Sequence, residues 1–209
     1  MAPPAKTTRR RGRRQGEPVS REAVLRAAKQ RFAVEGYEKT TLRAIASDAH
    51  VDPSMVLYLF GSKAELFRES LRLIVDPDVL VAAMTEGDDD IGTRMVRTYL
   101  GIWEHPDTAT SMVAMLQSAT SNSDAHEAFR AFMQSYVLTA VSDVLGGGEQ
   151  ARLRAMLAAT NLVGTAILRY VIKVAPLATL SRAEVIALIA PTVTRYLTAD
   201  AKELGLPEL

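Results

Sequence analysis

The sequence has 209 residues, of which 48% are hydrophobic and none is cysteine, which indicates a folded protein and excludes disulfides and thiolate metal sites. The net charge of +1 divides unevenly, because residues 1–72 carry 15 Lys and Arg against 8 Asp and Glu, whereas residues 73–209 carry 10 against 16. A basic first third on an acidic remainder predicts that one end meets a polyanion such as nucleic acid; a basic tail that only aids solubility is the alternative.

The first 17 residues predict a disordered basic arm, without the apolar stretch of a secretory signal. Such an arm makes sequence-independent phosphate contacts, and its arginines can also enter a narrow minor groove. The alternative is a solvated tail that never settles on DNA. The longest nearly uncharged segment, residues 155–168, is too short to span a bilayer, so we expect no membrane contact, and the lack of cysteine fits a cytoplasmic protein. The DNA-binding candidates of the arm are Arg9, Arg10, Arg11, Arg13 and Arg14.

Helical periodicity dominates the rest of the chain, and strand signals are nearly absent. A first helix is predicted at about residues 19–35, with Val34 on its apolar stripe and Gly36 as its C-terminal stop. A second, short helix is predicted near residues 41–48, with Thr40 or Thr41 as its N-cap.

A third helix is predicted at about residues 53–60, and both of its ends are marked. Asp52 is a good N-cap, Pro53 fits the first helical position, and Gly61 ends the helix. His50 falls at the sharp turn before it, and histidine is among the residue types enriched at positive φ. A short helix that presents one face is what a helix-turn-helix needs to enter the DNA major groove; an ordinary helical hairpin is the alternative.

The second and third helices carry candidates for DNA contact. Hydroxyls and N–H groups at the start of the second helix can reach phosphate, and Ser54 and Met55 are candidates for base edges. Tyr58 and Lys63 are phosphate candidates, Lys63 because it begins a fourth helix at a capping box over residues 62–65. The third helix has no Arg, Asn or Gln, which predicts modest direct readout. The set is Thr40, Thr41, Arg43, Pro53, Ser54, Met55, Tyr58 and Lys63, although each could serve only as a cap or a surface residue.

Longer helices follow the fourth one, so we expect an all-α protein of about nine helices. The sequence ends the fourth helix at Asp76-Pro77 and places an acidic connection at residues 85–90. The predicted helices lie near residues 89–104, 107–120, 123–145, 149–174 and 181–199.

The middle helices contain thioether and aromatic side chains that suit a pocket for an apolar ligand, although ordinary core packing is the alternative for each of them. These candidates are Met95, Tyr99, Trp103, Met112, Met115, Met133 and Tyr136. The last two helices are apolar over more surface than one core side needs, which predicts a dimer interface; a central place in a monomer core is the alternative. The interface candidates are Leu157, Val163, Ile167, Tyr170, Val185, Ile189, Val193 and Tyr196.

Residues 18–67 resemble the DNA-binding domain of the tetracycline-repressor (TetR) family of bacterial transcription regulators. The matching stretch reads FAVEGYEKTTLRAIASDAHVDPSMVLYLFGSKAELF, and its Phe-x-x-x-Gly-Tyr, Thr-Thr, Tyr-x-Phe and Ser-Lys-x-x-Leu-Phe motifs fall at the family's spacing. His50 and Phe60 depart from the family, which usually has Gly or a small residue at the first position and often His at the second. One C-terminal subfamily of actinobacterial regulators is similar to the segment NLVGTAILRYVIKVAPLATLSRAEVIALIAPTVTRYL.

The resemblance implies a three-helix helix-turn-helix domain at residues 18–67 and a larger helical effector-binding and dimerisation domain at residues 68–209. It also implies a homodimer that binds a palindromic double-stranded DNA operator and acts as a repressor, released by a small apolar effector. The same resemblance supports phosphate contacts from Thr41, Tyr58 and Lys63.

Two other classes of function are weighed against a regulator. The three histidines, His50, His105 and His126, lack metal-binding spacing, and the sequence has no nucleophile elbow, phosphate loop or dinucleotide fingerprint, so we expect no enzyme activity, metal or cofactor. The remaining alternative is an all-helical interaction module whose basic arm binds anionic partners without sequence-specific DNA recognition.

Overall fold

The computed structural model describes residues 21–208, and this part of the chain is helical without any strand, which confirms the all-α prediction. The predicted arm at residues 1–17, with Arg9, Arg10, Arg11, Arg13 and Arg14, lies outside the described residues. The helices are α1 (Arg21–Lys39), α2 (Leu42–Asp48), α3 (Pro53–Phe60), α4 (Lys63–Leu71), α5 (Pro77–Thr85), α6 (Ile91–Glu104), α7 (Pro106–Ser121), α8 (Ser123–Phe132), α9 (Leu138–Val144), α10 (Gly148–Ala166), α11 (Arg182–Thr198) and α12 (Ala201–Leu204), with π-helical segments η1 (Met133–Val137) and η2 (Ile167–Val171).

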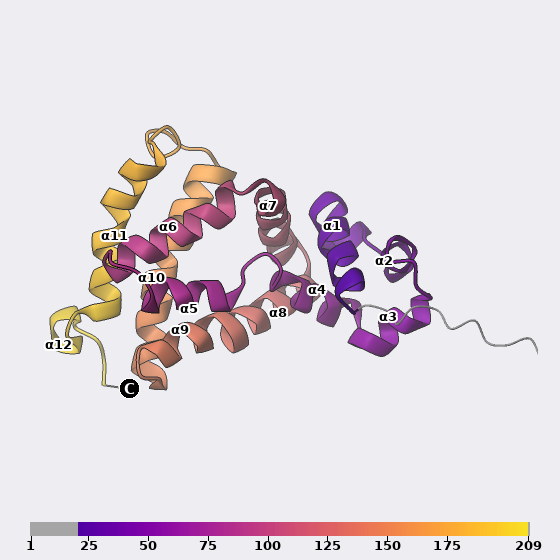
Figure 1. Cartoon of the computed structure of the whole chain (residues 1–209), viewed down its shortest axis with the longest axis horizontal. Helices are drawn as coiled ribbons and strands as arrows, with labels where there is room; N and C mark the ends of the chain where they lie inside the picture. The colour runs from indigo at the N-terminus through magenta and orange to yellow at the C-terminus, as the bar shows by residue number, and fades with distance from the viewer. Residues whose placement is uncertain (1–20, 209) are drawn as a thin grey trace, which may run out of the picture.

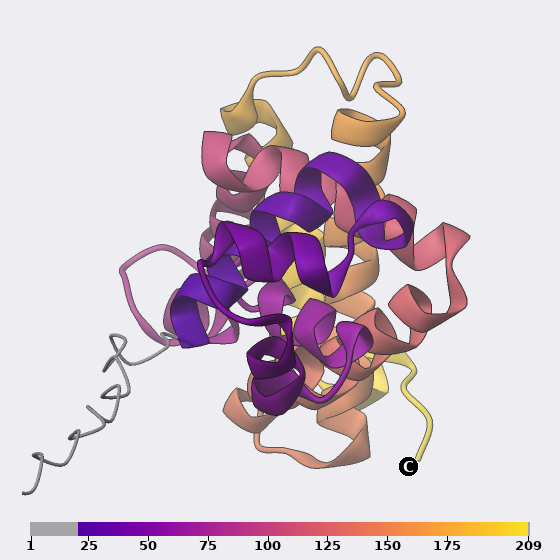
Figure 2. The same ribbon diagram turned by 90° about the vertical axis from the view of Figure 1, so that its right-hand side faces the viewer.

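The molecule is elongated, with α1, α2 and α3 at one end and α10, α11 and α12 at the other (Figure 1). Seen from the first end, α2 and α3 lie in front of the larger helical part (Figure 2). None of the helices between residues 21 and 208 is long and apolar enough to cross a membrane.

An aromatic cluster fixes α1 onto α4. The Phe67 ring centroid lies 5.0 Å from that of Phe32 and 5.2 Å from that of Tyr37, both in edge-to-face geometry, which favours aromatic pairs. The chain can turn back to place Tyr37 there because Gly36 interrupts α1 at φ 74°, a backbone conformation that side-chain-bearing residues rarely adopt. Val34, predicted on the buried stripe, is instead 83% exposed, because it lies on the opposite face of α1 from Phe32.

Helix α5 was missed by the sequence prediction, which assigned Asp76-Pro77 only as a stop. Asp76 instead caps α5 by accepting a hydrogen bond from the Asp78 backbone N–H at 3.0 Å, and Pro77 occupies the first turn. The short α12 was missed as well. The predicted helix at 123–145 is helical throughout, but it consists of α8, η1 and α9. In η1 the backbone hydrogen bonds follow the wider i→i+5 pattern.

Helix α6 packs tightly against α11 at Gly92. An ideal Cβ on Gly92 would lie 2.4 Å from the Ala190 carbonyl oxygen and 2.6 Å from the Thr194 backbone nitrogen, so only glycine fits there. Asp90 caps α6 through the Thr93 N–H at 3.0 Å and accepts hydrogen bonds from the hydroxyls of Thr93 and Thr194. This carboxylate therefore links two helices.

The Asp90 carboxylate is expected to make the stability of the fold depend on acid pH. Hydrogen bonds from Thr194 and then Thr93 lower the pKa of Asp90 from 3.8 to about 2. A lowered folded-state pKa contributes stability that is complete above the ordinary pKa and is lost as the pH falls toward about 2. Asp90→Asn should therefore lower the melting temperature at neutral pH, and its difference from wild type should shrink between about pH 4 and pH 2. Asp88→Asn, on the exposed loop nearby, is the matched control; equal melting curves for wild type and Asp90→Asn at every pH would contradict the assignment.

Candidate nucleic-acid interface and internal cavity

The turn between α2 and α3 is a helix C-cap motif built around His50. His50 has φ 54°, as predicted from its position, so an imidazole-bearing residue occupies the left-handed conformation usually given to glycine. The Val51 N–H bonds the Ala46 carbonyl at 2.9 Å, and the His50 N–H bonds the Ser47 carbonyl at 3.2 Å, which together close the end of α2. The turn therefore holds α3 at a fixed angle to α2.

Helix α3 begins and ends where the sequence predicts. The Asp52 carboxylate accepts hydrogen bonds from the Ser54 backbone N–H at 2.8 Å and from its hydroxyl at 2.6 Å, and these bonds lower the pKa of Asp52. Gly61, at φ 75°, ends the helix. Because the Ser54 hydroxyl proton points to Asp52, its oxygen is presented as an acceptor, which suits the amino groups of adenine or cytosine in the major groove.

The exposed face of α3 is more apolar than the sequence analysis anticipated. Val56 and Phe60 are buried, whereas Tyr58 is 84% exposed and Leu57 is 49% exposed. Leu57 was not among the predicted contacts, although the helical period places it beside Ser54 and Tyr58 on the outer face. An exposed leucine on this face suits contact with a thymine methyl group.

At the start of α2, two adjacent threonines differ in exposure and in hydrogen bonding. The Thr41 hydroxyl oxygen accepts a hydrogen bond from the Ala44 N–H at 3.1 Å, and Thr41 is exposed. Thr40 is only 1% exposed, and its hydroxyl donates to the Gly36 carbonyl at 2.8 Å, which contradicts the predicted phosphate contact from Thr40. Arg43 is exposed and forms no ion pair within residues 21–208, so its charge faces solvent.

Lys63 at the start of α4 is held in a defined position. Its ammonium lies 4.3 Å from the Tyr37 ring centroid and donates to the Glu38 carbonyl at 3.3 Å. Partial burial lowers the pKa of this ammonium. The capping box predicted at residues 62–65 is half formed, because Ser62 accepts from the Glu65 N–H while the Glu65 carboxylate pairs with Arg68.

An apolar cavity of about 70 Å³ lies inside the larger helical part, between α5, α6, α7, α8, η1, α9 and α10. Tyr99 is the one lining residue that carries a hydroxyl, and burial raises the pKa of Tyr99 to about 12. The volume holds a few water-sized spheres and is well below the roughly 300 Å³ of drug-sized pockets, so a larger ligand needs the helices to move. The predicted pocket residues that line it are Met95, Tyr99, Met112, Met115 and Met133.

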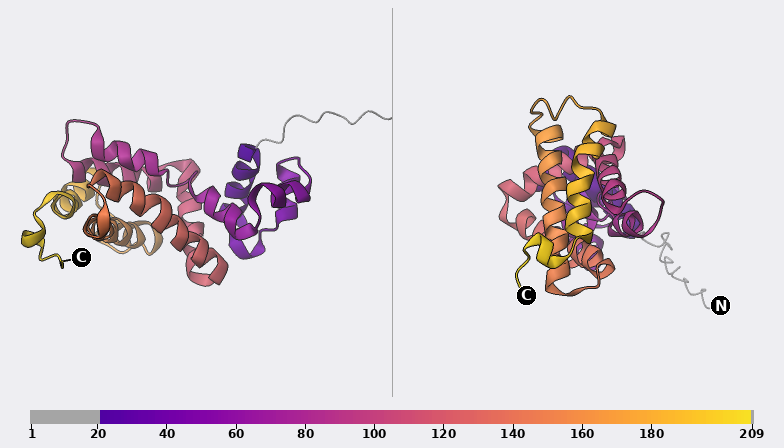
Figure 3. Two further views of the ribbon diagram at one scale, coloured as in Figure 1. Left: turned by 90° about the horizontal axis from the view of Figure 1, so that it is seen from below. Right: turned by 90° about the vertical axis from the view of Figure 1, so that its left-hand side faces the viewer.

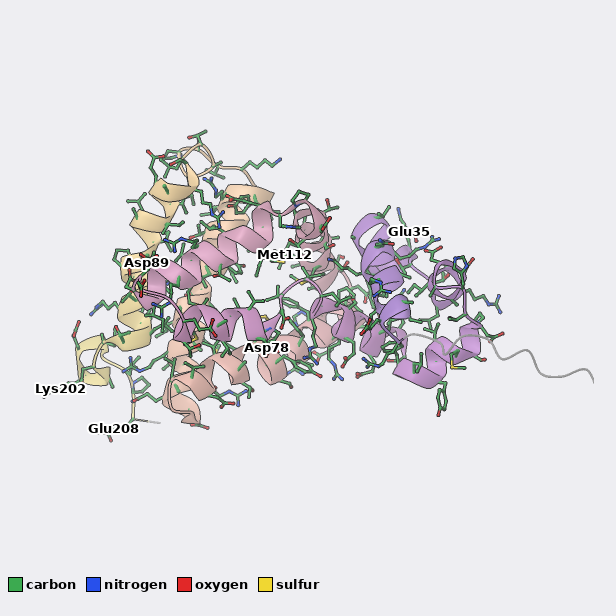
Figure 4. The ribbon with its side chains drawn as sticks, viewed as in Figure 1. Glu35, Asp78, Asp89, Met112, Lys202 and Glu208 are labelled. Atoms are coloured by element: carbon green, nitrogen blue, oxygen red, sulfur yellow. The ribbon has the colours of Figure 1, made fainter. Side chains whose placement is uncertain are left out.

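Two predicted pocket residues do not line the cavity, because their side chains contact other elements. Trp103 stacks on Tyr170 with ring centroids 5.5 Å apart and an interplanar angle of 8°. The Tyr136 hydroxyl donates to the Glu69 carboxylate on α4 at 3.3 Å. Met112 of α7 lies in the interior of the molecule, where α7 faces the other helices (Figure 4).

Two family models match this chain. The model described as bacterial regulatory proteins of the tetR family matches residues 24–70, and the model described as a tetracyclin repressor-like C-terminal domain matches residues 89–197. The second match alone covers more than half of the sequence. The chain belongs to the TetR family.

Solved structures of other bacterial regulators share this fold. A TetR-family regulator from Streptomyces coelicolor A3 is 35% identical, with a TM-score of 0.64 over 89% of this chain and 98% of that one. NalD of Pseudomonas aeruginosa, a secondary repressor of the MexAB-OprM multidrug efflux pump, is 20% identical, with a TM-score of 0.55 over 86% and 96% of the two chains. The fatty acid degradation regulator FadR from Bacillus halodurans is 18% identical, with a TM-score of 0.56 over 85% and 94%. No curated protein matches the sequence.

The TetR-type C-terminal part exposes a face formed by α10 and α11, which run side by side at the end farthest from α3 (Figure 3). Leu188 on α11 is 62% exposed, and Leu168 at the start of η2 is 43% exposed. Leu157 lies eleven residues before Leu168, about three helical turns, and so shares its face.

Several predicted interface residues are used inside the protomer instead. Val185 and Val193 are fully buried, so they cannot contact a second copy. The Tyr170 hydroxyl donates to Glu104 at 2.6 Å, and its ring stacks on Trp103. Val163 lines the cavity, and the remaining partly buried candidates are Leu157, Ile167, Ile189 and Tyr196.

Proposed function

We propose that this TetR-family transcription regulator is a homodimeric, sequence-specific repressor that a small apolar effector releases from a palindromic operator. The observation that carries the proposal is the outer face of α3. It is capped at both ends, joined to α2 by a fixed turn, and exposes Ser54, Leu57 and Tyr58. A helix with these properties enters the major groove with its N-terminal residues at the base edges.

Cationic groups around α3 support the proposed docking on phosphate. Arg43 lies exposed on α2, and Lys63 begins α4 with its ammonium fixed over Tyr37. The exposed Thr41 hydroxyl can donate to a phosphate oxygen while its oxygen caps α2. Lys39, also exposed, is a further candidate beyond the residues predicted from the sequence.

A homodimer is proposed because one such module reads too few base pairs for tight binding. The α10–α11 face supplies exposed leucines on α11 and on η2, the segment that continues α10, and a two-fold axis through it would pair like surfaces. We propose no catalytic role, metal or cofactor, and a cytoplasmic location follows from the proposed contact with DNA.

Effector binding could reach α3 through a continuous set of contacts. Met133 in η1 lines the cavity, and Tyr136 in the same segment donates to Glu69 on α4. The Glu69 carboxylate also pairs with Arg21 at 3.4 Å, and the Arg21 guanidinium lies 4.6 Å from the ring centroid of Phe60, the last residue of α3. A ligand that enlarges the cavity and displaces η1 would therefore disturb the contact between Arg21 and Phe60 that holds α3. Release from DNA requires such a difference, because the ligand must bind the DNA-free arrangement of α3 more tightly than the DNA-bound one.

Lys63→Ala is expected to weaken binding to every DNA sequence and to lower the slope of log affinity against log salt by about one. The reason is the loss of one ordered ammonium from the phosphate-facing end of α4. Lys202→Ala is the matched control, because Lys202 lies at the opposite end of the molecule (Figure 4). Titration of operator DNA at several salt concentrations measures both; an unchanged slope for Lys63→Ala would remove Lys63 from the interface.

The proposed function is tested by titrating the protein against the intergenic DNA beside its own gene and against a scrambled fragment of equal length, at several salt concentrations. A tight preference for the native fragment that persists at high salt is the expected result. Equal binding to both fragments that falls steeply with salt would favour the alternative of an interaction module with a basic arm.

A further inference from the structure

An open groove of about 1170 Å³ runs along the outside of the larger helical part, between α10 on one side and α8, η1 and α9 on the other. Residues of α9 and α10 line it and none of α11 does, although α11 also packs against α10. Its floor is apolar and includes Phe129, Met156 and Ile167. Segments η1 and η2 both contribute residues to it, and π-helical segments often mark functional sites.

The charge of this groove contrasts with that of its surroundings. Residues 73–209 carry 10 Lys and Arg against 16 Asp and Glu, yet the groove is lined by Arg130, Arg152 and His126 and by no acidic residue. Arg130 is already paired with Glu127, which lies outside the groove. Arg152 forms no ion pair within residues 21–208; its guanidinium donates only to the Gln134 carbonyl at 3.1 Å. Its remaining N–H groups can therefore bind an anion.

The groove and the internal cavity share a wall. Phe129, Met133, Leu138, Ala159 and Val163 line both of them. Met133, which belongs to η1, has the most flexible side chain of the five, so we expect its rotation to join the two spaces. A ligand could then place an apolar chain in the cavity, which is too small by itself, and leave a polar head in the groove.

We propose that the effector site takes a carboxylate-bearing amphiphile, with its alkyl chain passing the Met133 wall into the cavity and its carboxylate paired with Arg152. This inference rests on the proposed function, since it names the chemistry of the proposed effector. A planar carboxylate matches the guanidinium fork, which binds both oxygens at once. The apolar cavity lining suits a hydrocarbon chain. The positive charge in the groove has no role toward such a chain, so it indicates that the ligand also carries an anionic group.

The single tryptophan gives a direct readout of binding. Trp103 is 3% exposed, and its ring contacts Tyr99 in edge-to-face geometry with centroids 6.5 Å apart. Tyr99 lines the cavity, so a chain that enters there changes the surroundings of Trp103. Fluorescence of the full-length protein can therefore be titrated without DNA and without a label.

The experiment titrates dodecanoate and dodecanol, each below its aggregation threshold, into wild type, Arg152→Gln and Arg97→Gln. Arg97 is the matched control, because it is an exposed arginine paired with Asp89 outside the groove. Dodecanoate should bind wild type and Arg97→Gln about tenfold more tightly than it binds Arg152→Gln, as expected for loss of a charge-assisted hydrogen bond. Dodecanol should bind all three proteins equally. Equal affinity of wild type and Arg152→Gln for dodecanoate, or no fluorescence change with dodecanoate, would overturn the assignment.

A parallel titration with operator DNA separates this inference from the proposed function. If dodecanoate binds in an Arg152-dependent manner but leaves operator affinity unchanged, the site is correct and the effector role fails. If the protein without ligand shows no preference for operator DNA, the proposed function fails whatever the fluorescence shows. Release of operator from wild type but not from Arg152→Gln, at the same dodecanoate concentration, would support both.

Discussion

Replacing Leu188 with glutamate is expected to convert the proposed dimer into monomers and to weaken operator binding by at least about a hundredfold, because a monomer contacts only one half-site. Leu188 is 62% exposed on α11, the helix that runs beside α10 (Figure 3). Burying a leucine contributes roughly 1.5–3 kcal/mol, and two-fold symmetry counts the residue twice. The variant also places two carboxylates in an apolar interface, where charge is costly to bury.

Leu73→Glu is the control for this variant. Leu73 is 42% exposed in the turn between α4 and α5, away from α10 and α11, and its replacement should leave the dimer intact. Light scattering after size-exclusion chromatography gives the mass, and DNA titration gives the affinity. A Leu188→Glu protein that stays dimeric and binds operator normally would place the interface on another face.

Replacing Gly92 with alanine is expected to be the most destabilising single-methyl change in the larger helical part. The new Cβ would lie 2.2 Å from the Thr194 hydroxyl oxygen and 2.4 Å from the Ala190 carbonyl oxygen, so α11 must shift rather than a side chain. Overpacking of this kind costs roughly 1–3 kcal/mol and sometimes more. For a protein of this size each kcal/mol lowers the melting temperature by about 2–4 °C.

Gly101→Ala on the same helix is the matched control. Its Cβ would meet only the end of the Arg182 side chain, at 3.3 Å, and alanine is favoured over glycine in a helix by about 1 kcal/mol. Thermal unfolding followed by circular dichroism should therefore show a clear loss for Gly92→Ala and little change or a gain for Gly101→Ala. Similar melting temperatures for the two variants would show that α6 and α11 do not pack as closely as described.

The helices of the helix-turn-helix part could be predicted from the sequence because their turns and caps depend on local residues. Asp52-Pro53 and Gly61 bound α3 as expected, and His50 adopts positive φ where the family usually has a small residue. The same reasoning applied to Asp76-Pro77 would have found α5, because a residue pair that stops one helix can also cap the next.

Tertiary contacts explain what the sequence could not reveal. Helix α11 is apolar on more than one side, and its packing against α6 and α10 decides that Val193 is buried while Leu188 is exposed. Thr40 and Thr41 are chemically alike, yet the bend at Gly36 buries Thr40 and leaves Thr41 exposed. Tyr136 is drawn away from the cavity by Glu69, a residue 67 positions earlier in the chain. No local pattern encodes these choices.

Hydroxyl-radical footprinting on the operator fragment tests the central claim most directly. A dimer that inserts α3 from each protomer should protect two patches related by two-fold symmetry, with centres one helical turn of DNA apart, about 34–36 Å, or a multiple of it. Protection of this kind by wild type, and its loss in Leu188→Glu, is the result that we predict. Uniform protection along the fragment, or one unpaired patch from a protein that remains dimeric, would contradict the account.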